Sequence, residues 1–495
     1  MSIRHERSGI RQVSGFGLCG FSSDSLKSMH YATLSIFEKV GIKVESEKAA
    51  EFYSAAGALV EKQDGHFLVR FKPYLVEEMI RYSPSSVRYF GRDPKDDYIA
   101  EPNRVGFAQF GECINVIDPY TRELRSSVKK DCRDTALLAD ALSEICIMER
   151  SVCPGDMPSV SQPVHNLSAM LRGTSKHIVL GTDGRANLET MLEMGIAAVG
   201  DRERFFQRSI FTATVCPTSP LTLVKNCCES IIGAAENGIG ILIVSMCLSG
   251  GTSPASLAGT IVQHNVEILS AAILAQSVRK GTPCTYGSCT SIMDMKTAVS
   301  AVGAPEHGIL NAGLAKMAQF YEMPSLVGGG LSDSKLPDAQ VGYEFATNAL
   351  TSALAGANIV YGSGGMEMCL TFDYAKLLMD HEAMKNIQKI LRGVTVDDED
   401  LALEVIEAVG PGNTFLTQKH TFERARSQSR GELFDRSPRD KWQTTTGGNS
   451  LTERAYAKAI EIIETHKPLS LVDGAEERID EIISEYDQKI TRTVK

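Results

Sequence analysis

The sequence predicts an α/β fold: a (β/α)₈ TIM barrel with an N-terminal α+β extension and C-terminal helices. Short apolar runs alternate with amphipathic stretches between about residues 105 and 365, there are eight such runs, and they start roughly 30 to 45 residues apart. Runs that are apolar throughout, such as 241–245, suit strands covered by helices on both faces. Eight strand–helix units in series favour a barrel over an open doubly wound sheet, which usually carries a Gly-x-Gly-x-x-Gly turn after its first strand.

The expected barrel strands follow one another along the middle of the chain. Between them, Ser219-Pro220 and Ser253-Pro254 match the N-cap and first position of a helix, and Pro305 and Pro337 precede apolar residues at helical spacing. Two alternating runs around Asp118-Pro119 predict a β-hairpin at 114–125. The eight predicted strands are 105–110, 144–149, 176–181, 209–215, 240–247, 283–287, 324–329 and 357–361.

Three parts are expected along the chain. Residues 1–90 form an N-terminal cap, 91–379 form the barrel with its inserted hairpin, and 380–495 form a helical region packed on the barrel. Helices are predicted at 25–39 and 73–82 in the cap and at 451–465 and 475–489 in the last part.

Composition excludes several classes of protein. A net charge of −10 and a pI near 5.6 argue against a nucleic-acid-binding protein. The first 20 residues lack the apolar core of a signal peptide, and the run 239–248 is too short to span a membrane, so a cytoplasmic location is expected. The 12 cysteines form no Cys-x-x-Cys or His-x-Cys pair, which favours buried thiols over a metal site.

The strand ends hold the candidate chemistry, because barrel active sites lie at the carboxyl ends of the strands. Glu112, Glu149 and Arg150 follow the first two strands, but no nucleophile–base pair is evident there. Three glycines, 328–330, end the seventh strand and suggest the floor of a cavity. Four aromatic residues near strand ends could surround a cation, although packing of the barrel mouth is the alternative: Phe110, Tyr286, Tyr361 and Phe372.

Other reactive side chains are expected to be structural. His165 and His264 lie on predicted helices, where a structural role is commoner than a ligand role. Lys176 and Lys296 could form Schiff bases, but ion-paired or solvated lysines are far more frequent.

Specific segments along nearly the whole chain resemble the trimethylamine methyltransferase family of corrinoid-dependent methyltransferases, whose fold is a (β/α)₈ barrel. They are His30-Tyr-Ala-Thr33, Gly91-Arg-Asp93, Cys216-Pro-Thr-Ser-Pro-Leu221, Ser249-Gly-Gly-Thr-Ser-Pro254, Leu257-Ala-Gly-Thr260 with His264-Asn265, Tyr286-Gly-Ser288, Leu314-Ala-Lys-Met-Ala-Gln-Phe-Tyr321, Ala353-Leu-Ala-Gly-Ala-Asn358 and Tyr361-Gly362.

One departure from the family decides the expected substrate. In members that demethylate trimethylamine, the position matching Leu331 carries pyrrolysine, whose electrophilic ring activates the uncharged amine. The resemblance therefore implies that a chain with leucine there uses a quaternary amine, whose leaving group is already neutral. Glycine betaine is the expected donor, and its carboxylate is expected to meet donors of the strand end. The expected substrate-binding residues are Phe110, Tyr286, Gly329, Gly330, Leu331, Ser332, Tyr361 and Phe372, with no catalytic residue assigned.

The resemblance also implies the partners. The methyl acceptor is cob(I)alamin on a separate corrinoid protein that meets the open mouth of the barrel, and no cofactor is bound permanently. A homo-oligomer is expected. Alternatives are another betaine (proline betaine, carnitine or γ-butyrobetaine), a tertiary or secondary methylamine, a binding protein without catalysis, and a Schiff-base aldolase.

Overall fold

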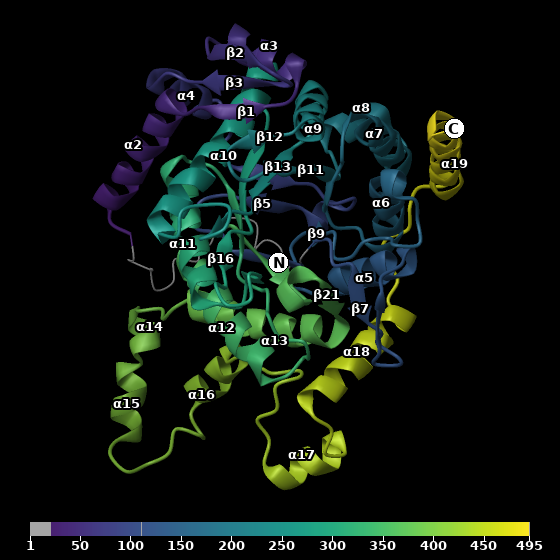
Figure 1. The fold of residues 1–495 in the computed structure, drawn as a ribbon. Coiled ribbons are helices and arrows are strands. Elements are labelled where there is room, and N and C mark those ends of the chain that lie inside the picture. The colour runs from purple at the N-terminus through teal and green to yellow at the C-terminus, as the bar shows by residue number, and fades with distance from the viewer. Residues whose placement is uncertain (1–20, 110, 495) are drawn as a thin grey trace.

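The computed structural model describes residues 21–109 and 111–494, and its centre is a closed barrel of parallel strands surrounded by helices (Figure 1). The strands neighbour one another in the order β6, β19, β18, β15, β13, β11, β10, β9, and a parallel bridge between Phe107 and Ile145 joins the two ends of the sheet. The predicted (β/α)₈ barrel is confirmed. Its strands are β6 (Gly106–Gln109), β9 (Met148–Glu149), β10 (Ile178–Gly181), β11 (Phe211–Val215), β13 (Ile241–Ser245), β15 (Cys284–Ser288), β18 (Ser325–Gly328) and β19 (Ile359–Ser363).

A helix follows each strand and packs outside the barrel. Phe345, Ala349 and Ala353 are buried at helical spacing, as the sequence pattern predicts, and they hold their helix against the sheet. The helices are α5 (Lys129–Ala141), α6 (Gln162–Gly173), α7 (Arg185–Val199) with the short α8 (Arg202–Gln207), α9 (Lys225–Glu236), α10 (Leu257–Val278), α11 (Pro305–Phe320), α12 (Ala339–Leu354) and α13 (Tyr374–Leu391).

Two predicted helix starts are wrong. Ser219-Pro220 lies in a loop before α9, which begins at Lys225, and Ser253-Pro254 lies before α10, which begins at Leu257. The Ser219 hydroxyl donates to the buried carboxylate of Glu267 on α10, at 2.7 Å, and so does not cap a helix. A Ser-Pro pair therefore serves here as a loop anchor.

The helix α10 is long, apolar and mostly buried. It has the length and apolar composition of a membrane-spanning helix, yet 78% of its most apolar window is buried inside the protein. It contacts α2, α3, α4 and α9, so its apolar surface is covered by other helices of the same chain.

The N-terminal part covers one side of the barrel and closes its lower end. Tyr89 and Tyr98, on the antiparallel pair β4–β5, enter the barrel from below: the Tyr89 hydroxyl lies 2.6 Å from Thr285 Oγ1, and the Tyr98 hydroxyl donates to the Asn358 carbonyl at 2.7 Å. Both rings belong to the buried cluster inside the barrel. The elements are α2 (Ser23–Lys39), β1 (Ile42–Val44), α3 (Glu47–Ala55), β2 (Leu59–Gln63), β3 (His66–Arg70), α4 (Pro73–Ile80), β4 (Val87–Tyr89) and β5 (Tyr98–Ala100).

The loops at the upper end of the barrel, where the strands reach their C-terminal ends, contain further short strands. The loop after β11 contributes β12 (Thr222–Leu223), which extends the N-terminal sheet beside β1. Two further sheets tie mouth loops to one another. They consist of β14 (Leu248–Ser249), β16 (Ser291–Met293) and β17 (Ser300–Ala301), and of β20 (Gly365–Met366), β21 (Thr371–Asp373), β7 (Asn115–Ile117) and β8 (Leu124–Ser126).

The C-terminal helices differ in how closely they pack. The helix α18 contacts α13 and α5, and α19 contacts α7 and α6, whereas α14, α15 and α16 hang away from the barrel on an arm (Figure 1). Their bounds are α14 (Asp398–Leu401), α15 (Leu403–Val409), α16 (Lys419–Arg424), α17 (Arg439–Thr446), α18 (Leu451–Thr465) and α19 (Ala475–Val494).

Candidate active site at the barrel mouth

The upper part of the barrel interior is lined by apolar side chains and thiols. Leu331, Tyr361 and Cys289 belong to one buried cluster, against which Cys369 also packs. Burial raises the pKa of the Tyr361 phenol, and the Cys289 thiol and Glu149 carboxyl lie close enough to raise it further. Of the predicted site residues, Leu331 and Tyr361 are thus brought together inside the barrel.

Segment 365–370, in the loop after β19, lies over this cluster. Met368 N donates to the Ser332 carbonyl at 3.4 Å, and Ser332 N donates to the Gly365 carbonyl at 3.2 Å. Leu331 is 0% exposed and Tyr361 1%. Both side chains are thus enclosed by the surrounding protein.

The predicted carboxylate donors of the glycine-rich strand end already have partners. Gly329 N and Gly330 N both donate to the Tyr361 carbonyl, at 3.1 and 2.9 Å, and the Ser332 hydroxyl donates to Glu344 at 2.5 Å. These three donors stabilise the protein's own loops. Each of the three donors at the strand end therefore has an acceptor within the protein.

Two predicted aromatic ligands face away from the mouth. Tyr286 lies on the outer face of β15, where its hydroxyl donates to Asn265 of α10 at 2.5 Å and its ring lies 5.4 Å from His264. Phe372 is buried in the small sheet at the rim, at right angles to Tyr374 with the ring centres 5.4 Å apart. Both belong to the outer core rather than to the cluster around Tyr361, because the pleat turns alternate side chains outward. Phe110 lies outside the described residues.

Two charged residues lie at the end of β9, whereas the predicted substrate-binding residues include none. Glu149 is buried, and burial raises the pKa of its carboxyl well above the usual range. Its Oε2 atom has no hydrogen-bond partner among the described residues. Its position after the second strand is visible in the sequence, but nothing there indicates that its carboxyl lacks a cationic partner.

The next residue, Arg150, lies over Gly181 at the end of β10. Its Nη2 atom lies 3.4 Å from the position that a Cβ would take at residue 181, an ordinary van der Waals contact, so the guanidinium packs over the end of β10. Arg150 pairs with Glu112 of the loop after β6, and its Nε atom has no partner among the described residues. Glu149 and Arg150, a buried acid and a buried cation, are thus consecutive residues at the end of β9.

Cys216, at the end of β11, shows that this side of the mouth is recessed. Cys216 is exposed to solvent, yet desolvation by the surrounding protein raises the pKa of its thiol to about 11. Arg150, Cys289 and Glu149 are near enough to influence that pKa. A side chain that is both accessible and surrounded lies in a hollow, so the accessible part of the site lies between β9 and β11.

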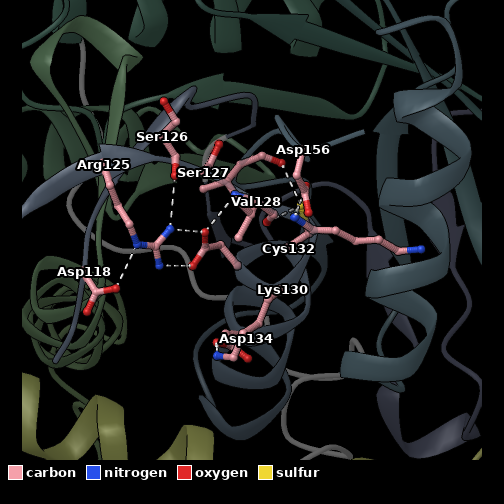
Figure 2. A network of polar contacts seen from close by, with 12 residues as sticks. Asp118, Arg125, Ser126, Ser127, Val128, Lys130, Cys132, Asp134 and Asp156 are labelled. Atoms are coloured by element: carbon pink, nitrogen blue, oxygen red, sulfur yellow. Dashed lines mark hydrogen bonds and ion pairs between the residues drawn. The ribbon is translucent and has the colours of Figure 1, made fainter. Parts of the chain in front are cut away.

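A polar network fixes the loops that carry Glu112 and Arg150 (Figure 2). Arg125 of β8 donates to both carboxylate oxygens of Asp131 at the start of α5, at 2.7 and 2.8 Å, and to Asp118 at 2.9 Å. Ser127 donates from its hydroxyl to the Cys153 carbonyl at 2.7 Å, which joins the loop after β6 to the loop after β9.

Two further buried groups hold the remaining mouth loops. Lys376 of α13 donates to the Gly330 carbonyl at 2.7 Å and to Asp380 at 2.5 Å, and Asp380 accepts from Gly364 N at 2.9 Å. Glu267 of α10 accepts from Ser219 and, at 2.5 Å, from Ser245. Neither was predicted, because both lie on helices far along the chain from the loops they bind.

The remaining reactive side chains have structural contacts. His264 lies 2.8 Å from Thr290 Oγ1 with its pKa lowered to about 3 by burial, and His165 lies 3.1 Å from Asp487. The Lys176 amine donates to three backbone carbonyls, and Lys296 is exposed on a loop. Among residues 21–109 and 111–494, no three His, Cys, Asp or Glu side chains group as a metal ion requires.

Comparison with known proteins identifies the family. A family model described as trimethylamine methyltransferase matches residues 14–491. The trimethylamine methyltransferase MttB of Desulfitobacterium hafniense is 42% identical over 484 residues, which is 98% of this chain and 97% of the relative. The Methanosarcina barkeri enzyme of the same name is 35% identical, covering 94% and 95%. A glycine betaine methyltransferase of Desulfitobacterium hafniense is 28% identical, covering 95% and 97%.

Solved structures agree on the fold. The hydroxylamine complex of MtmB superposes with a TM-score of 0.52 at 11% identity, over 94% of this chain and 92% of that one. The Methanosarcina barkeri monomethylamine methyltransferase MtmB gives a TM-score of 0.50, also at 11% identity, with the same coverage. Since the family model and the relatives span nearly its whole length, the protein belongs to the trimethylamine methyltransferase family, whose members are corrinoid-dependent methyltransferases.

Proposed function

We propose that the protein transfers a methyl group from a quaternary amine, with glycine betaine as the donor, to cob(I)alamin carried by a separate corrinoid protein. The single observation that carries this proposal is Leu331. It stands at the end of β18, inside the barrel, and its side chain is apolar and chemically inert. An uncharged amine would need activation at this place, whereas a quaternary ammonium needs only to be positioned and desolvated.

The charges at the mouth suit such a cation. Glu149 is a buried carboxyl with an unpartnered oxygen, close to the Tyr361 ring and the apolar cluster. A carboxylate and an aromatic face are the groups that attract a desolvated ammonium. In the proposed step the bond between one methyl carbon and nitrogen breaks, and nitrogen keeps the electron pair and becomes a neutral tertiary amine. Dimethylglycine leaves with its carboxylate still charged, and the methyl carbon bonds to cobalt.

The rim of the mouth supports docking of a macromolecular partner. Large apolar side chains are exposed on the loops after five neighbouring barrel strands, β6, β19, β18, β15 and β13, so they line one side of the opening. Such surfaces commonly mark protein contacts. They are Ile114, Met246, Met295, Val299, Leu336 and Leu370.

The experiment is a methyl-transfer assay with the purified chain, a corrinoid protein held as cob(I)alamin, and a panel of betaines and methylamines, followed by the absorbance of cobalt. We expect glycine betaine to react. The alternative donor is trimethylamine, favoured by the 42% identity to a trimethylamine methyltransferase. Reaction of trimethylamine with failure of every quaternary amine would refute the proposal.

We propose further that the protein is a cytoplasmic homo-oligomer in which a second copy covers the arm that carries α14–α16. This arm stands clear of the barrel in Figure 1, and it exposes Val394 by 82%, Leu416 by 84% and Phe422 by 68%. Every copy of the chain presents the same uncovered apolar side chains. Light scattering after chromatography should show an oligomer that Leu416→Asp with Phe422→Asp dissociates, and a monomeric wild-type chain would refute this.

A further inference from the structure

The carboxylate of the proposed substrate has no donor at the glycine-rich strand end, since Gly329, Gly330 and Ser332 all donate to the protein itself. Arg150 remains as a donor within the recess. Its side chain is only 10% exposed, its Nε atom lacks a partner among the described residues, and it lies close to the accessible Cys216. A buried polar atom without a partner costs free energy unless a ligand completes it.

We propose that Arg150 binds the carboxylate of the substrate, and that Glu112 occupies this place on the guanidinium until the substrate arrives. This assignment rests on the proposed function and adds to it the residue that binds the carboxylate of the quaternary amine. Arginine suits the role because its planar fork can hold a carboxylate through two parallel hydrogen bonds.

Glu112 has the properties of a replaceable partner. Its side chain is 58% exposed, although the arginine that it pairs with is buried. Its backbone adopts a φ of +85°, in the left-handed region that non-glycine residues rarely occupy. A carboxylate on a strained, solvent-facing loop can leave the guanidinium at little cost to the rest of the fold.

The last residue of β9, Glu149, and the residue after it, Arg150, match a zwitterion. Glu149 presents an unpartnered carboxyl oxygen, and Arg150 presents an unpartnered guanidinium nitrogen. A betaine carries an ammonium and a carboxylate separated by a short carbon chain. The titratable groups that face Glu149 are Cys289, Tyr361, Cys216 and Tyr89. None of them is cationic, so a cationic substrate suits that carboxyl.

The test compares glycine betaine with choline, which keeps the trimethylammonium group and lacks the carboxylate. Binding to the full chain is measured by titration calorimetry. Arg150→Gln should weaken glycine betaine binding about 10- to 100-fold, the usual loss for a hydrogen bond to a charged group, and leave choline binding unchanged. Glu112→Gln should strengthen glycine betaine binding about fivefold, because fewer molecules hold Arg150 in a competing pair.

Arg104→Gln is the matched control, since Arg104 is also 10% exposed and pairs with a glutamate, Glu101, before β6. It should alter neither ligand's affinity. An equal loss for both ligands in Arg150→Gln, or no loss, would overturn the assignment, as would an unchanged affinity in Glu112→Gln. If Arg150→Gln does not fold, Arg150→Lys and Glu112→Gln decide the matter.

The methyl-transfer assay separates this inference from the proposed function. A wild-type chain that uses no quaternary amine overturns both. A wild-type chain that uses glycine betaine, together with an Arg150→Gln variant that treats glycine betaine and choline alike, overturns only the role of Arg150.

Discussion

Replacing Lys376 by methionine should destabilise the protein strongly, although the residue lies on a helix outside the barrel. Its amine is 0% exposed and pairs with Asp380, which is 3% exposed, and it also binds the Gly330 carbonyl. Methionine would leave the Asp380 carboxylate buried with the Gly364 N–H as its remaining neighbour. Removing one partner of a buried ion pair costs about 3–5 kcal/mol.

The size of the thermal shift follows from the length of the chain. An unfolding entropy of about 2.1 cal/mol/K per residue gives about 1 kcal/mol/K for 495 residues that unfold together. Lys376→Met should therefore lower the unfolding midpoint in differential scanning calorimetry by about 3–5 °C. Lys389→Met is the control on the same helix, because Lys389 is exposed and its amine donates to the Ser427 carbonyl, at 3.1 Å, on the protein surface. It should cost no more than about 1 kcal/mol.

A second variant distinguishes the charge from the packing. Lys376→Met with Asp380→Asn removes both charges, so the double variant should recover about 2 kcal/mol or more of the loss caused by Lys376→Met alone. Burial already raises the pKa of Asp380. Without Lys376 the folded state would bind that proton still more tightly, and the loss should shrink as the pH falls from 7 to 5. A Lys376→Met variant that loses no more stability than Lys389→Met, or additive losses in the double variant, would refute the reasoning.

Three further predictions concern single groups. Burial raises the pKa of Asp373 from 3.8 to about 6, so the folded state holds this proton more tightly than the unfolded state does. The protonated Asp373 therefore stabilises the protein below about pH 4, and this stabilisation of about 3 kcal/mol is lost as the pH rises to 6. Asp373→Asn should remove this pH dependence of the unfolding free energy, measured by urea titrations at about pH 4 to 7. Tyr286→Phe should lower stability by about 1 kcal/mol through its lost hydrogen bond to Asn265 and leave the affinity for glycine betaine unchanged; a weakened affinity would return this ring to the pocket. Because the raised pKa of Glu149 favours its neutral form, binding of a cation should release a proton from its carboxyl. The heat of binding in calorimetry should then depend on the buffer, and Glu149→Gln should abolish that dependence. An identical heat in all buffers would contradict the role of Glu149.

The sequence pattern located the strand ends well but not the faces of the strands. Apolar runs and helix spacing predict all eight strands, because burial on both faces leaves a local signal. Which face a side chain takes depends on a pleat of period two, so a shift of one position reverses it. Tyr361 points into the barrel and Tyr286 points out to α10, although each is the third residue of a five-residue strand.

Long-range contacts explain the other differences. The three donors at 329–332 looked free in the sequence, but their acceptors are a carbonyl of the neighbouring strand and a glutamate on the next helix. Conversely, Glu149 and Arg150 looked like ordinary charged residues at a strand end. Their importance comes from missing partners, and a missing partner can be recognised only when the surroundings are known.

The tyrosine-filled pair β4–β5 has a kinetic consequence. Tyr89 and Tyr98 close the lower end of the barrel, so in the proposed reaction the donor amine, the corrinoid protein and the demethylated amine would all use the upper opening. Once the partner covers that opening, no amine can pass. Steady-state kinetics should therefore follow a compulsory order, in which the amine enters before the corrinoid protein docks and the demethylated amine leaves only after it departs.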